Sequence, residues 1–187
     1  LVKSAQARGE LSPELMARFA WKILVGRDRS VNAFALPGGK VVIQTGLIDH
    51  AKSWEEVLGV VGHELAHVTC RHHLRGVINN LGLFVIVSSF IGDFNSAAGA
   101  IINTGGDLAS LSNDRAFETE ADETGMNYLI ASQIDPKGMI SFFKTLKKES
   151  GSKMEDYTSF MSTHPATSER IQHLNDILKN KKYYIRD

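Results

Sequence analysis

The sequence predicts an α+β fold in which a small antiparallel sheet packs with several helices. Two runs rich in β-branched residues flank a PGG turn, apolar residues recur at helical spacing from Trp54 onward, and later segments open with helix-capping residues. The chain has 187 residues, of which 43% are hydrophobic and 22% charged, as is typical of a globular protein with a buried core. We therefore expect a single domain over residues 1–187.

Composition limits the classes of partner. Lysine plus arginine and aspartate plus glutamate both number 21, so no basic excess points to nucleic acid, and we expect no nucleic-acid partner. The single cysteine, Cys70, excludes an internal disulfide framework. The opening residues, LVKSAQARGELSPELM, lack the basic start and apolar run of a secretory signal, so we expect any targeting peptide to be missing or removed.

The first third of the chain supplies the predicted sheet and one long helix. SPELMARFAWKIL predicts a short helix that runs into a strand. VNAFALPGGKVVIQTGLI predicts a hairpin, in which Gly38 and Gly39 provide positive φ angles. Ser53 and Glu56 form a capping-box pattern before a helix whose apolar face includes Val57, Leu58, Val61, Leu65 and Val68.

Residues 81–106 are the one segment that suggests a membrane. The apolar part, Leu81 to Ile91, is shorter than the ~20 residues that a spanning helix needs, and Asp93 follows it. A buried helix or a lid over residues 82–112 is therefore favoured, and membrane association remains the alternative.

Three more helices are predicted toward the end of the chain. The first, DRAFETEADETGMNYLIAS, has Ser112 or Asn113 as its cap, and the second opens at Asp135 and Pro136. The last begins near Pro165. Apolar side chains at helical spacing are expected to form core, namely Met126, Met139, Phe142 and Phe143.

The stretch GHELAHVTCRHH, residues 62–73, carries the chemistry. His63 and His67 are one helical turn apart on the same face, so both imidazoles can reach a single Zn²⁺ at about 2.0–2.1 Å. Zinc acidifies water, and Glu64, next to His63, is placed to accept the proton as a general base. This combination indicates hydrolysis of an amide.

A catalytic zinc needs a third protein ligand, and FETEADETG offers Glu118. Asp122 lies one turn later and can accept the free N–H of a ligating imidazole. Glu120 is the competing ligand, but it faces away from this pair. His72 lies on the opposite side of the helix from His63, so we expect it to be packed or solvated. Cys70 is expected to be a small buried side chain, since a fourth protein ligand would close the site.

A second interpretation treats zinc as a folding staple in a latent or non-catalytic binding module of the chaperone type. That module would unfold without zinc and would hydrolyse nothing. Glu64 argues against it, because a structural site needs no general base beside its ligands.

Four stretches together resemble the M48 peptidases: HELAHVTCRH, ETEAD, STHPATSERI and NAFALPGGKVVIQTGL. The resemblance extends from about Asn32 to Ile171. It implies a gluzincin-like zincin fold and a zinc-dependent metalloendopeptidase with one Zn²⁺ per chain, held by His63, His67 and Glu118. It implies Glu64 as base and Asp122 as the carboxylate behind a ligand. His72 belongs to the same pattern and could brace the site.

The resemblance also assigns roles at the cleft. His164 and Arg170 match a histidine and an arginine near the metal. His164 would donate to the oxyanion or fill the open zinc position in a resting form, and Arg170 would hold the substrate or the glutamate ligand; simple packing is the alternative for both. In the family a strand lies beside the cleft, and an extended substrate peptide can pair with it. The resemblance therefore implies a substrate-binding strand formed by Asn32, Ala33, Phe34, Ala35 and Leu36.

The resemblance finally implies polypeptide substrates, which we expect to be misfolded or unfolded proteins. It suggests protein quality control in the periplasm or cell envelope. Nothing in the sequence indicates the oligomeric state.

Overall fold

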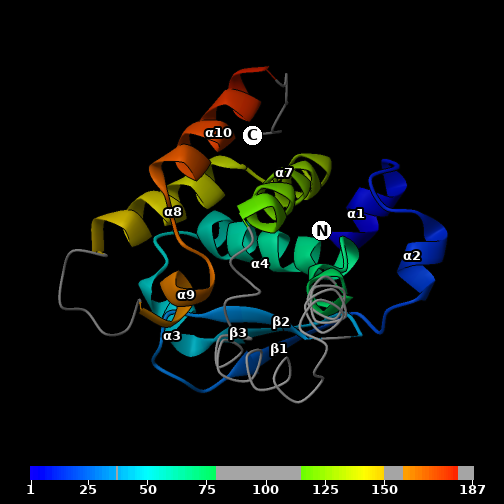
Figure 1. Ribbon diagram of the computed structural model, residues 1–187, viewed down its shortest axis with the longest axis horizontal. Coiled ribbons are helices and arrows are strands. Elements are labelled where there is room, and N and C mark those ends of the chain that lie inside the picture. The colour runs from blue at the N-terminus through cyan, green and yellow to red at the C-terminus, as the bar shows by residue number, and fades with distance from the viewer. Residues whose placement is uncertain (37, 79–114, 150–157, 181–187) are drawn as a thin grey trace, which may run out of the picture.

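The computed structural model describes residues 1–36, 38–78, 115–149 and 158–180. The predicted α+β class is confirmed, with a three-stranded sheet and mostly helices (Figure 1). The helices are α1 (Val2–Ala7), α2 (Pro13–Ala17), α3 (Thr45–His50), α4 (Trp54–Thr69), α7 (Arg115–Ala131), α8 (Lys137–Glu149), α9 (Thr158–Thr163) and α10 (Ser168–Asn180). The strands are β1 (Lys22–Gly26), β2 (Ala33–Leu36) and β3 (Lys40–Gln44). Residues 72–78 are also helical.

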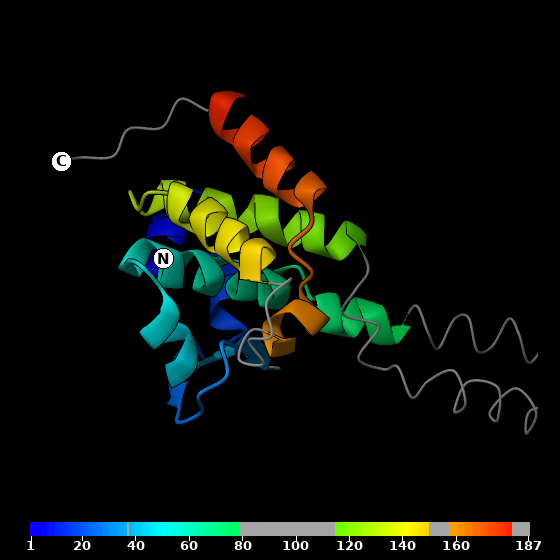
Figure 2. The ribbon, with the colours of Figure 1, turned by 90° about the vertical axis from the view of Figure 1, so that its left-hand side faces the viewer.

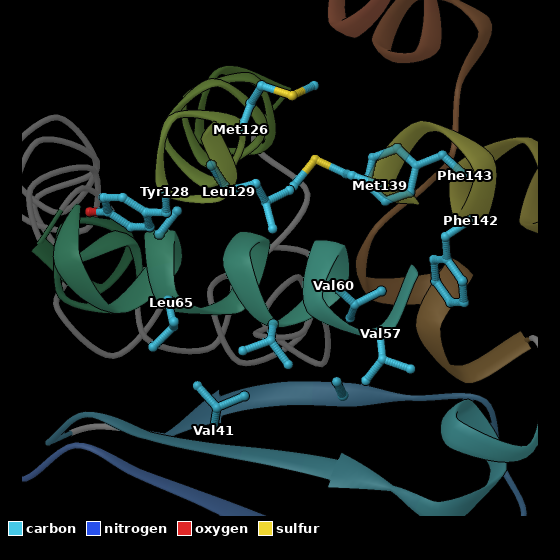
Figure 3. Close-up of a cluster of buried hydrophobic side chains, with 14 of the residues drawn as sticks. Val41, Val57, Val60, Leu65, Met126, Tyr128, Leu129, Met139, Phe142 and Phe143 are labelled. Atoms are coloured by element: carbon cyan, nitrogen blue, oxygen red, sulfur yellow. The ribbon is translucent and has the colours of Figure 1, made fainter. Parts of the chain in front are cut away.

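Helix α4 is the centre of the layered structure. It lies between the sheet on one side and α7 with α8 on the other, and α10 packs over α7 and α8 (Figures 1 and 2). In Figure 3, Val57 and Leu65 point from α4 toward the strand that carries Val41, while Leu129 and Met139 approach α4 from the other side. The two faces of α4 are thus covered by different layers.

The sheet is mixed rather than antiparallel. Its order is β1-β3-β2, and β2 and β3 form the predicted antiparallel hairpin, with φ of 85° at Gly38 and 88° at Gly39. Strand β1 runs parallel to β3, so the predicted antiparallel arrangement is wrong for this pair. The connection that follows β1 accounts for this arrangement. Its residue Asp28 accepts a hydrogen bond from the Gly46 amide just after the C-terminal end of β3, and β3 lies between the two earlier strands.

A short helix, α3, replaces the end of the second hairpin run. Thr45 Oγ1 donates to the carbonyl of Asp28 at 2.7 Å, and the Gly46 amide donates to the same oxygen at 2.8 Å. A Cβ at Gly46 would lie 2.0 Å from the carbonyl oxygen of Arg29. The sequence pattern of alternating apolar residues does not report such a long-range anchor, which ends the strand at Gln44.

The predicted helix starts agree in part with the structure. The Ser53 side chain caps α4 by accepting from the Glu56 amide, and Asp135 Oδ1 accepts from the Lys137 amide at 2.9 Å before α8. The last helix starts at Ser168 instead of near Pro165, because the Thr167 hydroxyl accepts from the Arg170 amide. The caps proposed for α7, Ser112 and Asn113, lie outside the described residues.

Glycines bring α4 and α7 into close contact. A Cβ at Gly125 of α7 would lie 2.9 Å from the Gly62 carbonyl carbon and 2.9 Å from the His63 amide nitrogen of α4. A Cβ at Gly125 would therefore force the helices apart, whereas a Cβ at Gly62 would lie 3.2 Å from the Gly125 carbonyl oxygen and crowd it less. Because of this close contact, the acidic first half of α7 lies over the histidines of α4.

The four predicted core residues Met126, Met139, Phe142 and Phe143 are fully buried, as expected. Residues 81–106, the candidate membrane segment, lie outside the described residues. Within the described part of the chain, no helix combines the length and the apolar character that crossing a membrane requires.

Candidate metal-binding and catalytic site

Three side chains on α4 and α7 converge in the buried space between these helices. The Nε2 atoms of His63 and His67 lie 3.0 Å apart, and Glu118 places Oε2 at 3.4 Å from His63 Nε2 and Oε1 at 3.2 Å from His67 Nε2. All three side chains are buried. We call His63, His67 and Glu118 the ligand triad.

The geometry of the ligand triad fits a zinc ion. Ligand atoms about 2.0–2.2 Å from a tetrahedral Zn²⁺ are separated from one another by roughly 3.3–3.6 Å, close to the separations observed here. Two imidazole nitrogens and one carboxylate also form a typical catalytic zinc set. The residues therefore fit the metal that the sequence predicts.

Asp122 and Arg170 stand behind the ligand triad. Asp122 Oδ1 lies 2.9 Å from His63 Nδ1, on the side of the ring away from the triad. Arg170 from α10 donates from Nε and Nη2 to the two oxygens of Asp122, both at 2.7 Å, and its Nη1 lies 2.8 Å from Glu118 Oε2. One guanidinium thus contacts the carboxylates of both Glu118 and Asp122.

Glu64 lies beside the ligand triad, with one carboxylate oxygen held by a backbone amide and the other near His164. Its Oε2 accepts a hydrogen bond from the Ala35 amide of β2 at 2.9 Å. Its Oε1 lies 3.3 Å from His164 Nε2. Glu64 is 1% exposed, so its carboxylate is shielded from bulk solvent.

His164, just after α9, reaches into the same space. Its Nδ1 lies 3.2 Å from His63 Nε2 and 3.1 Å from each oxygen of Glu118. The four groups His63, His67, Glu118 and His164 can each offer one donor atom to a common metal. The placement of His164 therefore suits a fourth metal donor as well as a group facing the reaction.

Burial and mutual contacts shift the pKa values of all three ligand-triad side chains. Burial lowers the pKa of His63, but the carboxylates of Asp122 and Glu118 outweigh that effect and raise it to about 9. Burial lowers the pKa of His67 to about 3. Burial raises the pKa of Glu118, yet its hydrogen bonds to the histidines dominate and hold the pKa far below its usual range. Without metal, therefore, His63 carries a proton and Glu118 is ionised.

The predicted substrate strand forms one wall of a cleft beside the ligand triad. β2 is an edge strand, since β3 is its only neighbour in the described sheet. Phe34 and Leu36 are about one-third exposed, and Asn32 donates from Nδ2 to Ser159 Oγ at 2.8 Å. The cleft has a volume of about 490 Å³ and is lined by Asn32, Phe34, Ala35, Glu64, His67, His72, His73, Gly76, Val77, Phe117, Thr163 and His164.

His72, near the site, has neighbours that the sequence did not predict. Helix α4 ends at Thr69, and Arg71 has a φ of 56°, so His72 does not continue the helical face. The His72 Nδ1 atom lies 2.9 Å from His67 Nδ1, and His72 Nε2 lies 3.3 Å from Glu120 Oε2. The prediction assumes one continuous helix over residues 62–73, in which His72 would lie opposite His63. Because the helix ends at Thr69, His72 can instead contact His67.

Cys70 is partly buried, and its Sγ lies 3.7 Å from Thr124 Oγ1. Burial raises the pKa of its thiol. It does not belong to the group of donors around the ligand triad.

Comparison with known proteins identifies the family. The model of peptidase family M48 matches residues 10–178. The mitochondrial metalloendopeptidase OMA1 of Arabidopsis thaliana is 37% identical over 81% of this chain, and the metalloprotease LoiP of Escherichia coli is 32% identical over 83%. A putative beta-barrel assembly-enhancing protease of Vibrio cholerae is 32% identical over 78%.

The matched region covers only part of each relative: 30% of OMA1, 61% of LoiP and 32% of the Vibrio protein. The family match nevertheless extends over nearly the whole of this chain, and it confirms the resemblance found in the sequence motifs. The chain belongs to peptidase family M48.

Proposed function

We propose that this chain is the peptidase domain of a zinc-dependent metalloendopeptidase that hydrolyses peptide bonds in protein substrates. The observation that carries the proposal is the position of Glu64, whose carboxylate lies beside the ligand triad and accepts from the Ala35 amide on the edge of β2 that is not paired with β3. A general base is useful there only if a reacting bond lies in the cleft. Family membership supports the same reaction class.

The substrate backbone is proposed to pair with β2. The Gln44 amide donates to the Asn32 carbonyl, so the peptide groups of Asn32 and Phe34 face β3. The backbone N–H and C=O groups of Ala33 and Ala35 therefore point away from β3, and of these two residues Ala35 lines the cleft, with its amide donating to Glu64. An extended peptide can add to this edge as a further strand, which brings a backbone carbonyl toward Glu64.

The chemistry then follows from three groups. A zinc ion held by His63, His67 and Glu118 would polarise the scissile carbonyl and acidify a water molecule. Glu64 accepts the proton of the attacking water and returns it to the leaving amine, so the peptide bond breaks with the net addition of one water. His164 Nε2, beside Glu64, donates to the oxyanion that forms during attack.

Arg170 is proposed to hold the glutamate ligand rather than the substrate. Arg170 is 8% exposed, and its guanidinium contacts Asp122, Glu118 and the Pro165 carbonyl. The alternative of a direct substrate contact would require it to leave these partners.

A latent form is the second candidate, favoured by the contacts of His164. With Nδ1 at 3.1–3.2 Å from both Glu118 oxygens and from His63 Nε2, the imidazole is placed where it can act as a fourth metal donor. Catalysis would then require a movement of His164 away from that position.

We extend the proposal to misfolded or unfolded substrates. Strand addition at β2 needs an extended segment, and unfolded chains offer such segments far more readily than folded ones. A role in quality control in the periplasm or cell envelope is our hypothesis, and it is supported by a relative named as a beta-barrel assembly-enhancing protease.

The test is cleavage of an unfolded protein such as casein, followed by mass spectrometry of the products. The proposal predicts new termini with the mass of one added water at each cut. It also predicts that a chelator abolishes cleavage and that added zinc restores it. Cleavage that continues at full rate after metal removal would refute the proposal.

A further inference from the structure

The second zinc ligand on α4, His67, lies against another imidazole. His67 Nδ1 points away from the ligand triad and lies 2.9 Å from His72 Nδ1. The His72 ring is 4% exposed and stacks on Phe117, with centroids 4.7 Å apart and an interplanar angle of 10°. This stacking fixes the plane of the ring.

Beyond His72 the contact continues to a carboxylate. His72 Nε2 lies 3.3 Å from Glu120 Oε2, and Arg75 Nη1 lies 2.6 Å from the same oxygen. The Arg75 guanidinium also sits over Phe117, 4.6 Å from the ring centroid. The Phe117 ring therefore packs against both side chains that approach Glu120, the His72 imidazole and the Arg75 guanidinium.

We propose that His72 and Glu120 are positioning residues that fix the orientation and tautomer of His67 as a metal ligand. This inference rests on the proposed function, since it takes the ligand triad as the zinc site. We refer to His67, His72 and Glu120 as the imidazole chain.

Bonding rules allow only one arrangement of protons along the imidazole chain. A His67 that offers the Nε2 lone pair to zinc carries its proton on Nδ1. His72 Nδ1 must then accept that proton's hydrogen bond, so neutral His72 carries its own proton on Nε2. His72 Nε2 lies 3.3 Å from Glu120 Oε2, within ion-pair distance but without the alignment of a hydrogen bond. A small rotation of the partly exposed Glu120 side chain would let this carboxylate, which can only accept, take the Nε2 proton.

The two metal-binding histidines are then supported in parallel ways. His63 Nδ1 lies 2.9 Å from Asp122 Oδ1, and Asp122 is paired with Arg170. His67 contacts His72, which in turn lies near Glu120, and Glu120 is paired with Arg75. A carboxylate behind a ligating imidazole orients the ring and increases its basicity, and loss of such support typically weakens metal binding 10–100-fold.

A competing use of the same residues is a second metal site. Cys70, His72 and Glu120 each have a donor atom within 4.8 Å of the others. That use conflicts with the imidazole chain, because a metal on His72 Nε2 would replace the proton that Glu120 accepts. The contact between Glu120 and Arg75 also opposes it, since a cation already holds the carboxylate.

The test compares zinc affinity, by chelator competition, in the wild type and three variants. His72→Phe keeps a flat ring against Phe117 but has no acceptor for His67, and we expect a loss of affinity of roughly 10–100-fold. His72→Asn places an oxygen near the position of Nδ1 and should restore most of the affinity. Glu120→Gln should give a smaller loss, with a shifted visible spectrum in the cobalt-substituted protein.

A double-mutant cycle shows whether Glu120 acts through His72. The proposal predicts that Glu120→Gln changes affinity in the wild type and has no further effect in the His72→Phe background. The matched control is Glu123→Gln, which removes a carboxylate of α7 that pairs with the exposed His173. This control should bind zinc like the wild type.

Several outcomes would overturn the proposal. Wild-type affinity in both His72→Phe and Glu120→Gln would refute the imidazole chain while leaving the proposed function intact, provided that the wild type binds zinc and cleaves casein. Two zinc ions per wild-type chain, one of which is lost in Cys70→Ser, would show the competing metal site instead. Should His72→Phe fail to fold, the partly exposed Glu120→Gln still decides the question.

Discussion

At the scale of single residues, His164 is the side chain whose role most affects the mechanism. Its two nitrogens face different groups: Nδ1 faces Glu118 and His63, and Nε2 faces Glu64. An oxyanion donor accelerates the reaction, whereas a fourth metal donor blocks it. The same substitution therefore separates the two roles by the sign of its effect.

We expect His164→Ala to lower kcat by roughly 10²–10³, with zinc still bound, because an oxyanion donor is lost. The measurement is steady-state cleavage of a quenched fluorescent peptide together with zinc content. A higher kcat in the variant would contradict the catalytic role and assign His164 to the latent form. An unchanged kcat would leave only packing.

The raised pKa of His63 predicts how zinc binding depends on pH. Because the metal-free site holds a proton on His63 below about pH 9, zinc must displace it. Affinity should therefore rise about tenfold per pH unit between roughly pH 6 and pH 8. Chelator competition at several pH values measures this slope, and an affinity independent of pH over that range would contradict it.

The same pKa has a consequence for stability with the opposite sign. In the metal-free protein, the protonated His63 pairs with Asp122 and Glu118. A group with a raised folded-state pKa contributes stability below its unfolded value of 6.5, and the contribution is lost as the pH rises through about 9.

At the scale of elements, the site depends on how closely α7 approaches α4. Glu118 and Asp122 contact His63 only because the backbones meet at Gly62 and Gly125. Zinc binding should therefore respond to a change in helix spacing at Gly125, which does not itself touch the ligand triad.

Gly125→Ala tests this dependence. Helix propensity alone favours alanine by about 1 kcal/mol, but the new Cβ would lie 2.9 Å from backbone atoms of α4. We expect a net loss of about 1–3 kcal/mol in the free energy of unfolding and weaker zinc binding. Gly62→Ala, whose Cβ would meet its nearest atom at 3.2 Å, should cost less. Denaturant unfolding measures both, and a stabilised Gly125→Ala would contradict the account.

The sequence predicts elements well where the signal is local. Caps at Ser53 and Asp135 are short-range hydrogen bonds and mark α4 and α8 correctly. The parallel pairing of β1 and the helix at Thr45 depend on contacts with Asp28 far away in sequence, so no local pattern reveals them.

The same contrast applies to the site. Periodicity on one helix brings His63 and His67 together, and the same reasoning pairs Glu118 with Asp122. It misplaces His72, because it assumes that α4 continues beyond the break at Arg71. The site roles themselves stay predictions until the variants are measured.

At the scale of the whole molecule, the site joins segments that are distant in the chain. β2, α4, α7, the residue after α9 and α10 each contribute a side chain or a backbone group. The main hydrophobic cluster, however, forms from side chains outside the ligand triad. We therefore expect the fold to survive metal removal.

Removal of zinc should lower the melting temperature without unfolding the protein at room temperature. Zinc at about a thousand times its Kd stabilises the folded state by about 4 kcal/mol, which for a chain of this size corresponds to roughly 10 °C. Circular dichroism with chelator and with excess zinc measures the difference. Complete unfolding in chelator would favour the zinc-stapled binding module instead.

Parallel measurement of zinc content and casein cleavage in the wild type and Glu64→Gln shows whether Glu64 is the general base of a zinc peptidase. Glutamine can still accept from the Ala35 amide but is a poor base, so we expect about one zinc per chain in both proteins and a loss of roughly 10²–10⁴ in rate only in the variant. Glu55→Gln, an exposed position on the same helix, is the matched control and should cleave normally. Cleavage by Glu64→Gln at the wild-type rate would contradict the account.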